Sequence, residues 1–427
     1  MFDKQLSRRD FFRTSASSGG AVALGRLASS RVLGSNDRLH FGFIGTGNKG
    51  MEHLKNFMKR TNEDNIRCVA VCDVYQKRIT KAVGISQADS YTDYRRLLER
   101  KDIEAVLIST PDHWHAQMAV DALESGKHVY LEKPMTLTID QALQVRDAVK
   151  RYGKVLQVGV NSTAEDIFWQ AQRIIRADRI GKVTWAQASY NRNGRVCFFN
   201  APPFEIEPSA GPKAQGDNYI DWDMWLGHEF ELAPKIPFNA EHFFRFRKYW
   251  AYSGGVATDL LYHRLAPLLI AIAGKNGEYP LRGSAQGGLY VEKDGRDIPD
   301  TFLMSLDYPS EYSIFLVSTL TNNTQLPTRI YGKHGTADIS EELELRVNGK
   351  FGLEFAAKNN GYHEVKVAPN LGRDLLGNFI DVIRGGGSLY CNADLGAATM
   401  VAIKLAVEAY RQEKTLTWDR KRERVGV

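Results

Sequence analysis

The sequence predicts an α/β protein in which a doubly wound parallel sheet precedes a second α/β domain with an open, mostly antiparallel sheet. From Leu39 to about Gly159, short apolar runs alternate with helical stretches, as a parallel sheet requires. After Gly181 the chain changes to strands separated by turn residues. Its 427 residues are enough for two hydrophobic cores. The expected division is a tail over 1–37, a first domain over 38–160 and a second domain over 161–427.

The first domain is expected to alternate strictly between strands and helices. Its last helix starts at Thr138, which has capping-box spacing to Gln141. The expected strands are 40–45, 67–73, 104–109, 127–131 and 155–160, and the expected helices are 48–60, 75–84, 92–100, 114–125 and 138–152.

The second domain begins with an expected helix, 165–177, and a strand from Val183 to Tyr190. Residues 191–250 form a long irregular stretch rich in proline, glycine and aromatic residues, and we expect this stretch to cover a substrate pocket. The other expected strands are 284–292, 300–308, 311–319, 327–332 and 344–348, and the closing helices are 372–384 and 394–412, which can pack back on the first domain.

Composition excludes several classes of protein. Apolar residues make up 43% and charged residues 25%, as in an ordinary globular chain. The net charge of +6 is small and the lysines and arginines are scattered, so nucleic acid is not an expected partner. No run of 18 apolar residues occurs, so no membrane-spanning helix is expected. The four cysteines follow no zinc-site spacing.

The N-terminus reads Ser7-Arg8-Arg9-Asp10-Phe11-Phe12-Arg13, followed by a weakly apolar stretch of small residues. This pattern predicts a twin-arginine export signal, and hence a periplasmic or otherwise exported protein. Twin-arginine export carries folded proteins, which suits one that acquires a cofactor in the cytoplasm. The alternative is a disordered basic tail on a cytoplasmic protein.

A glycine-rich loop follows the first apolar run. Its spacing, G-x-G-x-x-G, suits the turn from a buried strand into a helix whose N-terminus binds a pyrophosphate. The loop residues assigned to the cofactor are Gly45, Thr46, Gly47, Asn48 and Gly50. Asp73 ends the next apolar run, roughly twenty residues on, where a carboxylate would accept hydrogen bonds from the adenosine ribose. Such an acid favours NAD over NADP, although Asp73 can also be read as a solvated acid at a strand end.

Three further stretches carry chemistry. Ser109-Thr110-Pro111-Asp112-His113-Trp114-His115 follows a strand, at the sheet edge where ligands bind in this architecture. Glu132-Lys133-Pro134 follows another strand, so Lys133 would reach the nicotinamide end of the cleft. In residues 254–263, Asp259 and His263 stand four apart and would share one helix face.

Together these motifs resemble the Gfo/Idh/MocA oxidoreductases, and the resemblance covers roughly residues 38–415. The matching residues are Gly45, Gly47, Gly50, Thr110, Pro111, His113, His115, Glu132, Lys133, Pro134, Gly255, Asp259 and His263. The resemblance implies a Rossmann domain with bound NAD(P) and an open sheet that often forms the interface of a dimer or tetramer. It also implies that Lys133, Asp259 and His263 surround the reacting carbinol. Many members continue the last motif as His-x-x-Asp, whereas Ala266 stands at that place here.

The residue types suit oxidation of a secondary alcohol. His263, with an ordinary pKa near 6.5, is the expected base. Lys133 would hold the oxygen and stabilise its developing charge, and Asp259 would orient His263 or bind a neighbouring hydroxyl. Thr110, Pro111, His113, His115 and Glu132 are assigned to the cofactor site, with simple packing as the alternative for the two histidines. A zinc site made of His113, His115, Asp259 and His263 is conceivable by ligand type, but no spacing requires one, so no metal is expected.

Three functions remain in order of preference. The first is an NAD-dependent oxidoreductase that acts on a sugar, glycoside or cyclitol with a tightly bound, recycled cofactor. The second is an NAD-dependent glycosidase that works by transient C3 oxidation, elimination, hydration and re-reduction. We rank it second because glycosidases of this kind lack the lysine of Glu-Lys-Pro, which Lys133 supplies here. The third is a non-catalytic sugar-binding protein, which the intact motifs disfavour.

Overall fold

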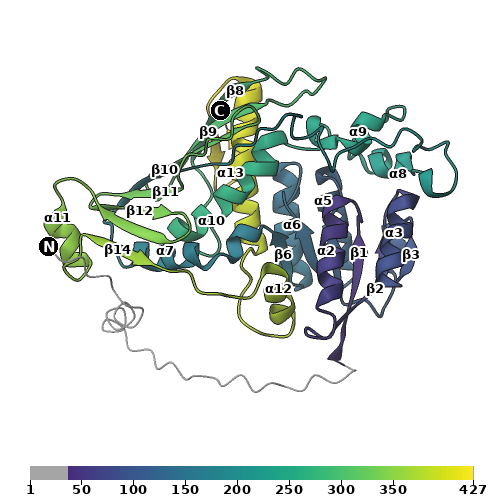
Figure 1. Ribbon diagram of the computed structural model, residues 1–427, viewed down its shortest axis with the longest axis horizontal. Coiled ribbons are helices and arrows are strands. Elements are labelled where there is room, and N and C mark those ends of the chain that lie inside the picture. Colours follow the sequence, from purple (N-terminus) through teal and green to yellow (C-terminus); the bar gives the residue numbers. More distant parts are fainter. Residues whose placement is uncertain (1–36, 427) are drawn as a thin grey trace.

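The computed structural model describes residues 37–426, so the predicted twin-arginine signal lies outside the described residues. The predicted fold class is confirmed. A six-stranded parallel sheet near the N-terminus is followed by a ten-stranded sheet that is antiparallel except for one pair of strands (Figure 1). Within residues 37–426, no helix combines the length and apolar character needed to cross a membrane.

The first sheet has the strand order β3-β2-β1-β4-β5-β6. Because the order reverses between β1 and β4, a crevice is expected there at the carboxyl ends of the strands. The strands are β1 (Leu39–Ile44), β2 (Ile66–Cys72), β3 (Asp89–Tyr91), β4 (Ala105–Ile108), β5 (His128–Glu132) and β6 (Leu156–Gly159). The sequence did not predict β3, because this three-residue edge strand has no apolar run.

Helices cover both faces of this sheet. Phe43 of β1 packs in one core cluster with Phe57 of α2, and the neighbouring Ile44 packs in another with Ala119 of α5, as the alternation of a strand requires. The capping box predicted at Thr138 is present. The helices are α2 (Asn48–Lys59), α3 (Gln76–Ser86), α4 (Tyr94–Leu98), α5 (Asp112–Glu124) and α6 (Ile139–Tyr152).

The second sheet has the order β14-β13-β12-β11-β7-β10-β9-β8-β15-β16. Alternate residues of β9 and β10 are buried, so one face packs on helices and the other is open. The strands are β7 (Val183–Ser189), β8 (Arg282–Gly288), β9 (Thr301–Tyr308), β10 (Tyr312–Thr319), β11 (Arg329–Gly332), β12 (Gly335–Ile339), β13 (Leu343–Val347), β14 (Glu364–Val367), β15 (Leu416–Asp419) and β16 (Arg424–Gly426).

The last helices connect the two sheets. α13 contacts both α6 and β8 and lies between the domains in Figure 1. Phe379 of α12 packs on Phe41 of β1, with ring centres 6.3 Å apart. The helices after the first domain are α7 (Asp166–Arg176), α8 (Trp222–Leu226), α9 (Ala240–Phe244), α10 (Tyr262–Ala273), α11 (Gly352–Lys358), α12 (Leu375–Ile383) and α13 (Ala393–Gln412).

Residues 203–246, which we call the strap, leave the second domain and return over the first (Figure 1). Lys77 of α3 forms an ion pair with Glu207 at 2.8 Å, and Thr80 donates a hydrogen bond to Asp217 at 2.8 Å. Tyr75 and Ile220 form an antiparallel bridge. The strap has its own aromatic core, which includes Trp222, Trp225 and Phe243 and contacts Tyr75. It is therefore a docked structural unit rather than an open loop.

Candidate active site

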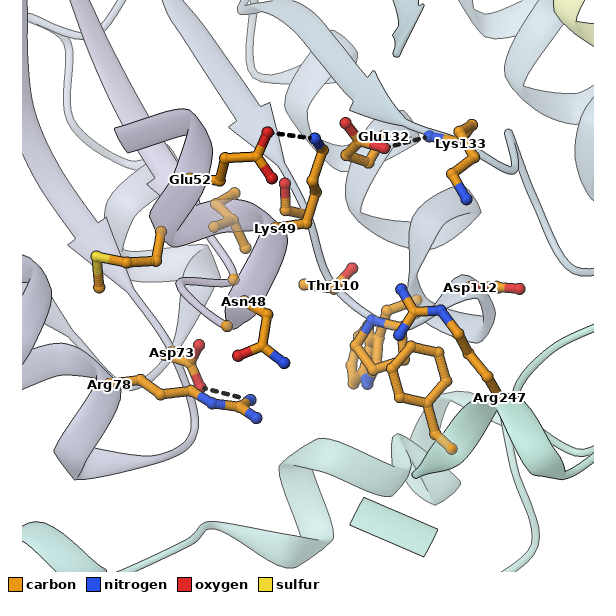
Figure 2. A pocket seen from close by; sticks show the side chains of 18 of the residues that line it. Asn48, Lys49, Glu52, Asp73, Arg78, Thr110, Asp112, Glu132, Lys133 and Arg247 are labelled. Carbon is orange, nitrogen blue, oxygen red and sulfur yellow. Dashed lines mark hydrogen bonds and ion pairs between the residues drawn. The ribbon is translucent and has the colours of Figure 1, made fainter. Parts of the chain in front are cut away.

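A cavity of about 810 Å³ lies where the carboxyl ends of the first sheet meet the second domain and the strap. Figure 2 shows Asp73 and Arg78 on one side of it, and Lys133, Asp112 and Arg247 on the other. It is lined by most of the residues that the sequence assigned to a site: Gly45, Gly47, Asn48, Asp73, Thr110, Pro111, Glu132, Lys133, Asp259 and His263. Segments far apart in the sequence thus meet at one place, with the glycine loop at one end and the lysine–histidine group at the other.

The glycine loop fits a phosphate-bearing cofactor. Gly45 has φ +83°, and a Cβ there would lie 2.8 Å from the backbone of Ser109. A Cβ at Gly50 would lie 2.0 Å from the carbonyl oxygen of Gly45. Gly47 precedes α2, and no side chain caps the N-terminus of this helix. The first N–H groups of α2 are therefore left for an anion, and the pyrophosphate of NAD suits them.

Asp73 is held rigidly beside this loop. Its carboxylate accepts hydrogen bonds from the backbone N–H of Thr46 at 2.7 Å and of Tyr75 at 3.0 Å. The guanidinium of Arg78 lies 3.9 Å away and also approaches Gly47, where a Cβ would be 3.4 Å from it. The neighbouring Lys77 is turned to the strap by its ion pair with Glu207. The preference of Asp73 for an unphosphorylated ribose stays a prediction.

Glu132 orients the turn that carries Lys133. One carboxylate oxygen lies 2.5 Å from His53 Nε2, and the other accepts the backbone N–H of Lys133 at 3.0 Å. Burial alone would raise the pKa of Glu132, but the hydrogen bond and charge of His53, followed by the charge of Lys133, hold this pKa at about 2. Glu132 is therefore an ionised carboxylate fully engaged by protein groups. His53 belongs to no motif, so its contact with Glu132 was not predicted from the sequence.

Lys133 and Asp259 lie at the end of the cavity that is opposite the glycine loop. Lys133 Nζ donates to the Asp259 carboxylate and to its backbone carbonyl, each at 2.8 Å. Arg247 Nε donates to the same carboxylate oxygen at 3.2 Å. Burial opposes ionisation of Asp259, yet the charges of Lys133 and Arg247 hold its pKa well below the usual range. Sequence reasoning missed Arg247, because it lies in the irregular stretch and belongs to no spaced motif.

His263 lies one turn beyond Asp259. A π-helical turn, Ala257–Leu261, carries Asp259, and α10 begins at Tyr262. Burial, and then the positive charge of Lys133, lower the pKa of His263 to about 3. The pKa of His263 in this site thus lies well below the intrinsic value of a histidine. His263 is a neutral imidazole at neutral pH and is ready to accept a proton, but it is a weaker base than expected.

His113 and His115 lie behind the cavity wall, as do Thr46 and Gly50. His113 Nε2 is 2.9 Å from the Trp225 carbonyl, so this histidine ties α5 to the strap, and burial lowers its pKa to about 4. The ring of His115 lies between the carbonyls of Pro134 at 2.7 Å and Thr110 at 2.9 Å. The structure thus places both histidines as links between walls of the cavity. Among residues 37–426, no three histidine, cysteine or acidic side chains are grouped to hold a metal.

Comparison with known proteins adds to this geometry. Residues 39–160 match the profile of the GFO_IDH_MocA oxidoreductase family with an NAD-binding Rossmann fold. The first domain is thus similar to the NAD-binding Rossmann domain of the Gfo/Idh/MocA oxidoreductases. The matched range contains the glycine loop, Asp73 and Lys133.

Curated relatives are similar to only part of the chain. A glycosyl hydrolase family 109 protein of Shewanella pealeana is 29% identical over 215 residues, which are 44% of this chain and 46% of the relative. An alpha-N-acetylgalactosaminidase of Shewanella oneidensis is 34% identical over 185 residues, which are 40% of this chain and 38% of the relative. The chain thus spans less than half the length of either relative.

A solved structure is similar over the whole fold. The WlbA dehydrogenase of Bordetella pertussis, crystallised with NADH and UDP-GlcNAcA, superposes with a TM-score of 0.62 at 16% identity. The match covers 90% of this chain and 99% of that one. At this identity the likeness establishes the shared two-domain fold.

Proposed function

We propose that this chain is an NAD-dependent enzyme that transiently oxidises a secondary hydroxyl of a glycoside, and that the net reaction is hydrolysis. The main observation that supports this proposal is that Lys133, Asp259 and His263 line the same cavity as the glycine loop. The hydrolytic outcome is supported by the relatives that are named glycosyl hydrolases. This order reverses the one expected from the sequence, where Lys133 placed the oxidoreductase first.

The residues divide the work as follows. When bound, NAD supplies a hydride acceptor for the carbinol carbon and returns the hydride at the end of the cycle. His263, neutral in this site, accepts the hydroxyl proton. The Lys133 ammonium, fixed by Asp259 at 2.8 Å, donates to the carbinol oxygen and stabilises the charge that develops there. A carbonyl at C3 acidifies the hydrogen at C2. Loss of this proton from C2 expels the aglycone from C1, where it takes up a proton, and water then adds its hydroxyl at C1 and its hydrogen at C2. The C3 ketone finally takes back the hydride and the hydroxyl proton.

The second candidate is a net oxidoreductase that passes the hydride to another sugar-like acceptor. Lys133 favours it, since an ammonium poised at the carbinol oxygen is what a simple alcohol–ketone interconversion needs. Both candidates share the first oxidation and differ only in whether the bond at C1 breaks.

Isotope exchange distinguishes the two candidates. The NAD-loaded protein is incubated in deuterated water with a panel of nitrophenyl glycosides, including the α-N-acetylgalactosaminide. Hydrolysis through C3 oxidation predicts release of nitrophenol and deuterium at C2 of the sugar. Oxidation without deuterium at C2 and without nitrophenol would favour the second candidate. Nitrophenol release without deuterium would contradict both.

We also propose that NAD stays bound between cycles and that the protein is exported. The support for retention is the strap, which lines the cavity through Pro203, Phe204 and Phe243 and accepts a hydrogen bond from Asn48 of the glycine loop at 2.8 Å. The support for export is the twin-arginine pattern of residues 7–13. Since free NAD is scarce outside the cytoplasm, retention and export fit one another.

A homo-oligomer is part of the same proposal. The open face of the second sheet carries Trp185, which is 38% exposed and stacks on Tyr331 with ring centres 3.9 Å apart. An exposed aromatic pair on a broad sheet is typical of an interface. Light scattering that reports a monomer would remove this part of the proposal.

A further inference from the structure

Arg192 follows β7 and lines the cavity at the end occupied by His263. Its backbone N–H donates to the Thr319 carbonyl at 2.8 Å, which fixes it to the end of β10. Its guanidinium carbon lies 4.6 Å from the ring centre of Phe198 and 5.1 Å from that of Tyr190. One Nη donates to the Tyr190 hydroxyl at 2.7 Å, whereas the buried Nε has no hydrogen-bond partner.

No carboxylate of residues 37–426 lies within 4.0 Å of the Arg192 guanidinium. A charged group lining a cavity is costly unless it is paired or solvated. Aromatic faces attract a guanidinium, but they do not neutralise its charge. Arg192 is therefore held in place by its neighbours while its charge remains available.

Arg247 stands on the same wall. Its guanidinium carbon lies 5.5 Å from the ring centre of Phe204, and Phe204 in turn packs 6.0 Å from Phe198, the ring beneath Arg192. Only the Nε of Arg247 has a hydrogen bond, to Asp259, among the contacts of the described chain. The side chains of Arg192 and Arg247 thus both line the cavity, and the rings of Phe198 and Phe204 lie between their guanidinium groups.

The balance of charge at this end is positive. The cations are Lys133, Arg192 and Arg247. Of the two ionised carboxylates, Asp259 is shared by Lys133 and Arg247, and Glu132 is bound by His53 and by the backbone N–H of Lys133. Asp112 is a third acid at this end of the cavity, and its Oδ2 has no hydrogen-bond partner among residues 37–426. Burial raises the pKa of Asp112, which favours its neutral form.

We propose that the substrate carries an anionic substituent, a carboxylate, sulfate or phosphate, and that Arg192 together with Arg247 binds it. The inference rests on the proposed function and names the substrate class of the same site: an acidic sugar or a glycoside of one. A guanidinium presents its donors in a planar fork that matches such oxyanions. The phenylalanine rings between the two arginines offer an apolar surface for the sugar ring.

The cofactor is not the source of this anion. Its phosphates belong at the glycine loop and the N-terminus of α2. Arg192 instead adjoins His263 through Tyr190, whose ring centre is 5.8 Å from that of His263. The anion that it meets therefore enters with the substrate, beside the reacting carbon.

The test is a set of binding titrations on the NADH-loaded protein, in which the reduced cofactor prevents oxidation of the ligand. Paired probes share the stereochemistry of the ring and differ in the group at C6, which is charged in one and neutral in the other: D-galacturonate and D-galactose, D-glucuronate and D-glucose, with galactose 6-sulfate and galactose 6-phosphate as further arms. We expect the best anionic probe to bind about 10- to 100-fold more tightly than its neutral partner, the usual worth of a hydrogen bond to a charged group. Added salt should reduce this ratio.

Two variants locate the effect. Arg192→Gln should lower the ratio of anionic to neutral affinity toward the part that Arg247 alone supplies, and Arg192→Lys should lower it less. Arg195→Gln is the matched control, because Arg195 lies on the same loop, is exposed and does not line the cavity. NADH fluorescence reports whether each variant is folded and loaded.

Equal binding of anionic and neutral probes by the wild type would overturn the inference without any variant. An unchanged ratio in Arg192→Gln would also overturn it. Turnover of neutral glycosides with no preference for anions would leave the proposed function standing and remove only this inference. Tight binding of an anionic sugar with no turnover of any of its glycosides would support the inference and contradict the proposed function.

Discussion

Replacing Asp259 by Asn tests the charged centre of the cavity directly. The variant keeps the size of the side chain but removes the charge that Lys133 and Arg247 share. Breaking a buried ion pair by removing one partner typically costs about 3–5 kcal/mol. The side chains of Lys133 and Arg247 are 13% and 23% exposed, so water can partly solvate them in the variant. We therefore expect the free energy of unfolding to fall by about 3 kcal/mol at neutral pH.

The dependence of this loss on pH follows from the direction of the pKa shift. The pKa of Asp259 is lower in the folded protein than in the unfolded chain. The stability it contributes is thus present above the unfolded value of about 4 and is lost as the pH falls through the lowered folded value. The difference between wild type and variant should be largest near neutral pH and should shrink below about pH 4.

Urea unfolding at several pH values measures this difference. Asp223→Asn is a control, because the Asp223 side chain is 71% exposed and its ion-pair contact among residues 37–426, with His228, is long at 3.9 Å. We expect the control to lose less than about 0.5 kcal/mol. A variant at Asp259 as stable as the wild type at neutral pH, or no less stable than the control, would refute the electrostatic argument.

Three other predictions follow from the site. Lys133→Ala or His263→Ala should each lower turnover by about 10²- to 10⁴-fold while NAD binding is kept, and near-full activity in both would show that the site is elsewhere. Because the folded pKa of His263 is about 3, the unfolded chain binds more protons up to about pH 6.5, so the free energy of unfolding should rise with pH across this interval, and His263→Gln should flatten the rise in denaturant titrations. A desalted preparation should hold stoichiometric NAD(H) in its denatured extract and turn over without added NAD, and an empty protein that needs free cofactor would contradict retention. Because of Asp73, the protein should reload with NAD(H) in preference to NADP(H), and equal or tighter NADP(H) binding would contradict the role of Asp73.

The local pattern of apolar residues was sufficient to predict strands that are buried in the hydrophobic core. The strands β1, β2 and β4 are dense apolar runs, and their positions were predicted to within one or two residues. The strands β3, β12 and β14–β16 were missed because they are short, and pairing to a neighbour rather than their own sequence makes them strands. The sequence of a short strand does not show which other strand it pairs with.

The site divides in the same way. The glycine loop, Lys133 and the Asp259–His263 pair carry fixed spacings that the sequence shows, and these residues line one cavity. Arg192 and Arg247 reach it only because the strap and β7 fold over it, and neither belongs to a motif. The low pKa of His263 could not be predicted from the sequence either, because it results from burial and from the nearby ammonium of Lys133, and both depend on the tertiary fold.

The strap also has a consequence for the order of events during folding. It is fastened to the first domain by the bridge between Tyr75 and Ile220 and by the contacts of Lys77 and Thr80. With NAD retained as proposed, the strap would have to detach locally before the dinucleotide could leave, and the rate of escape would then include a local unfolding step. Entry would use the same opening, so loading would be fastest before the strap docks, while the chain folds.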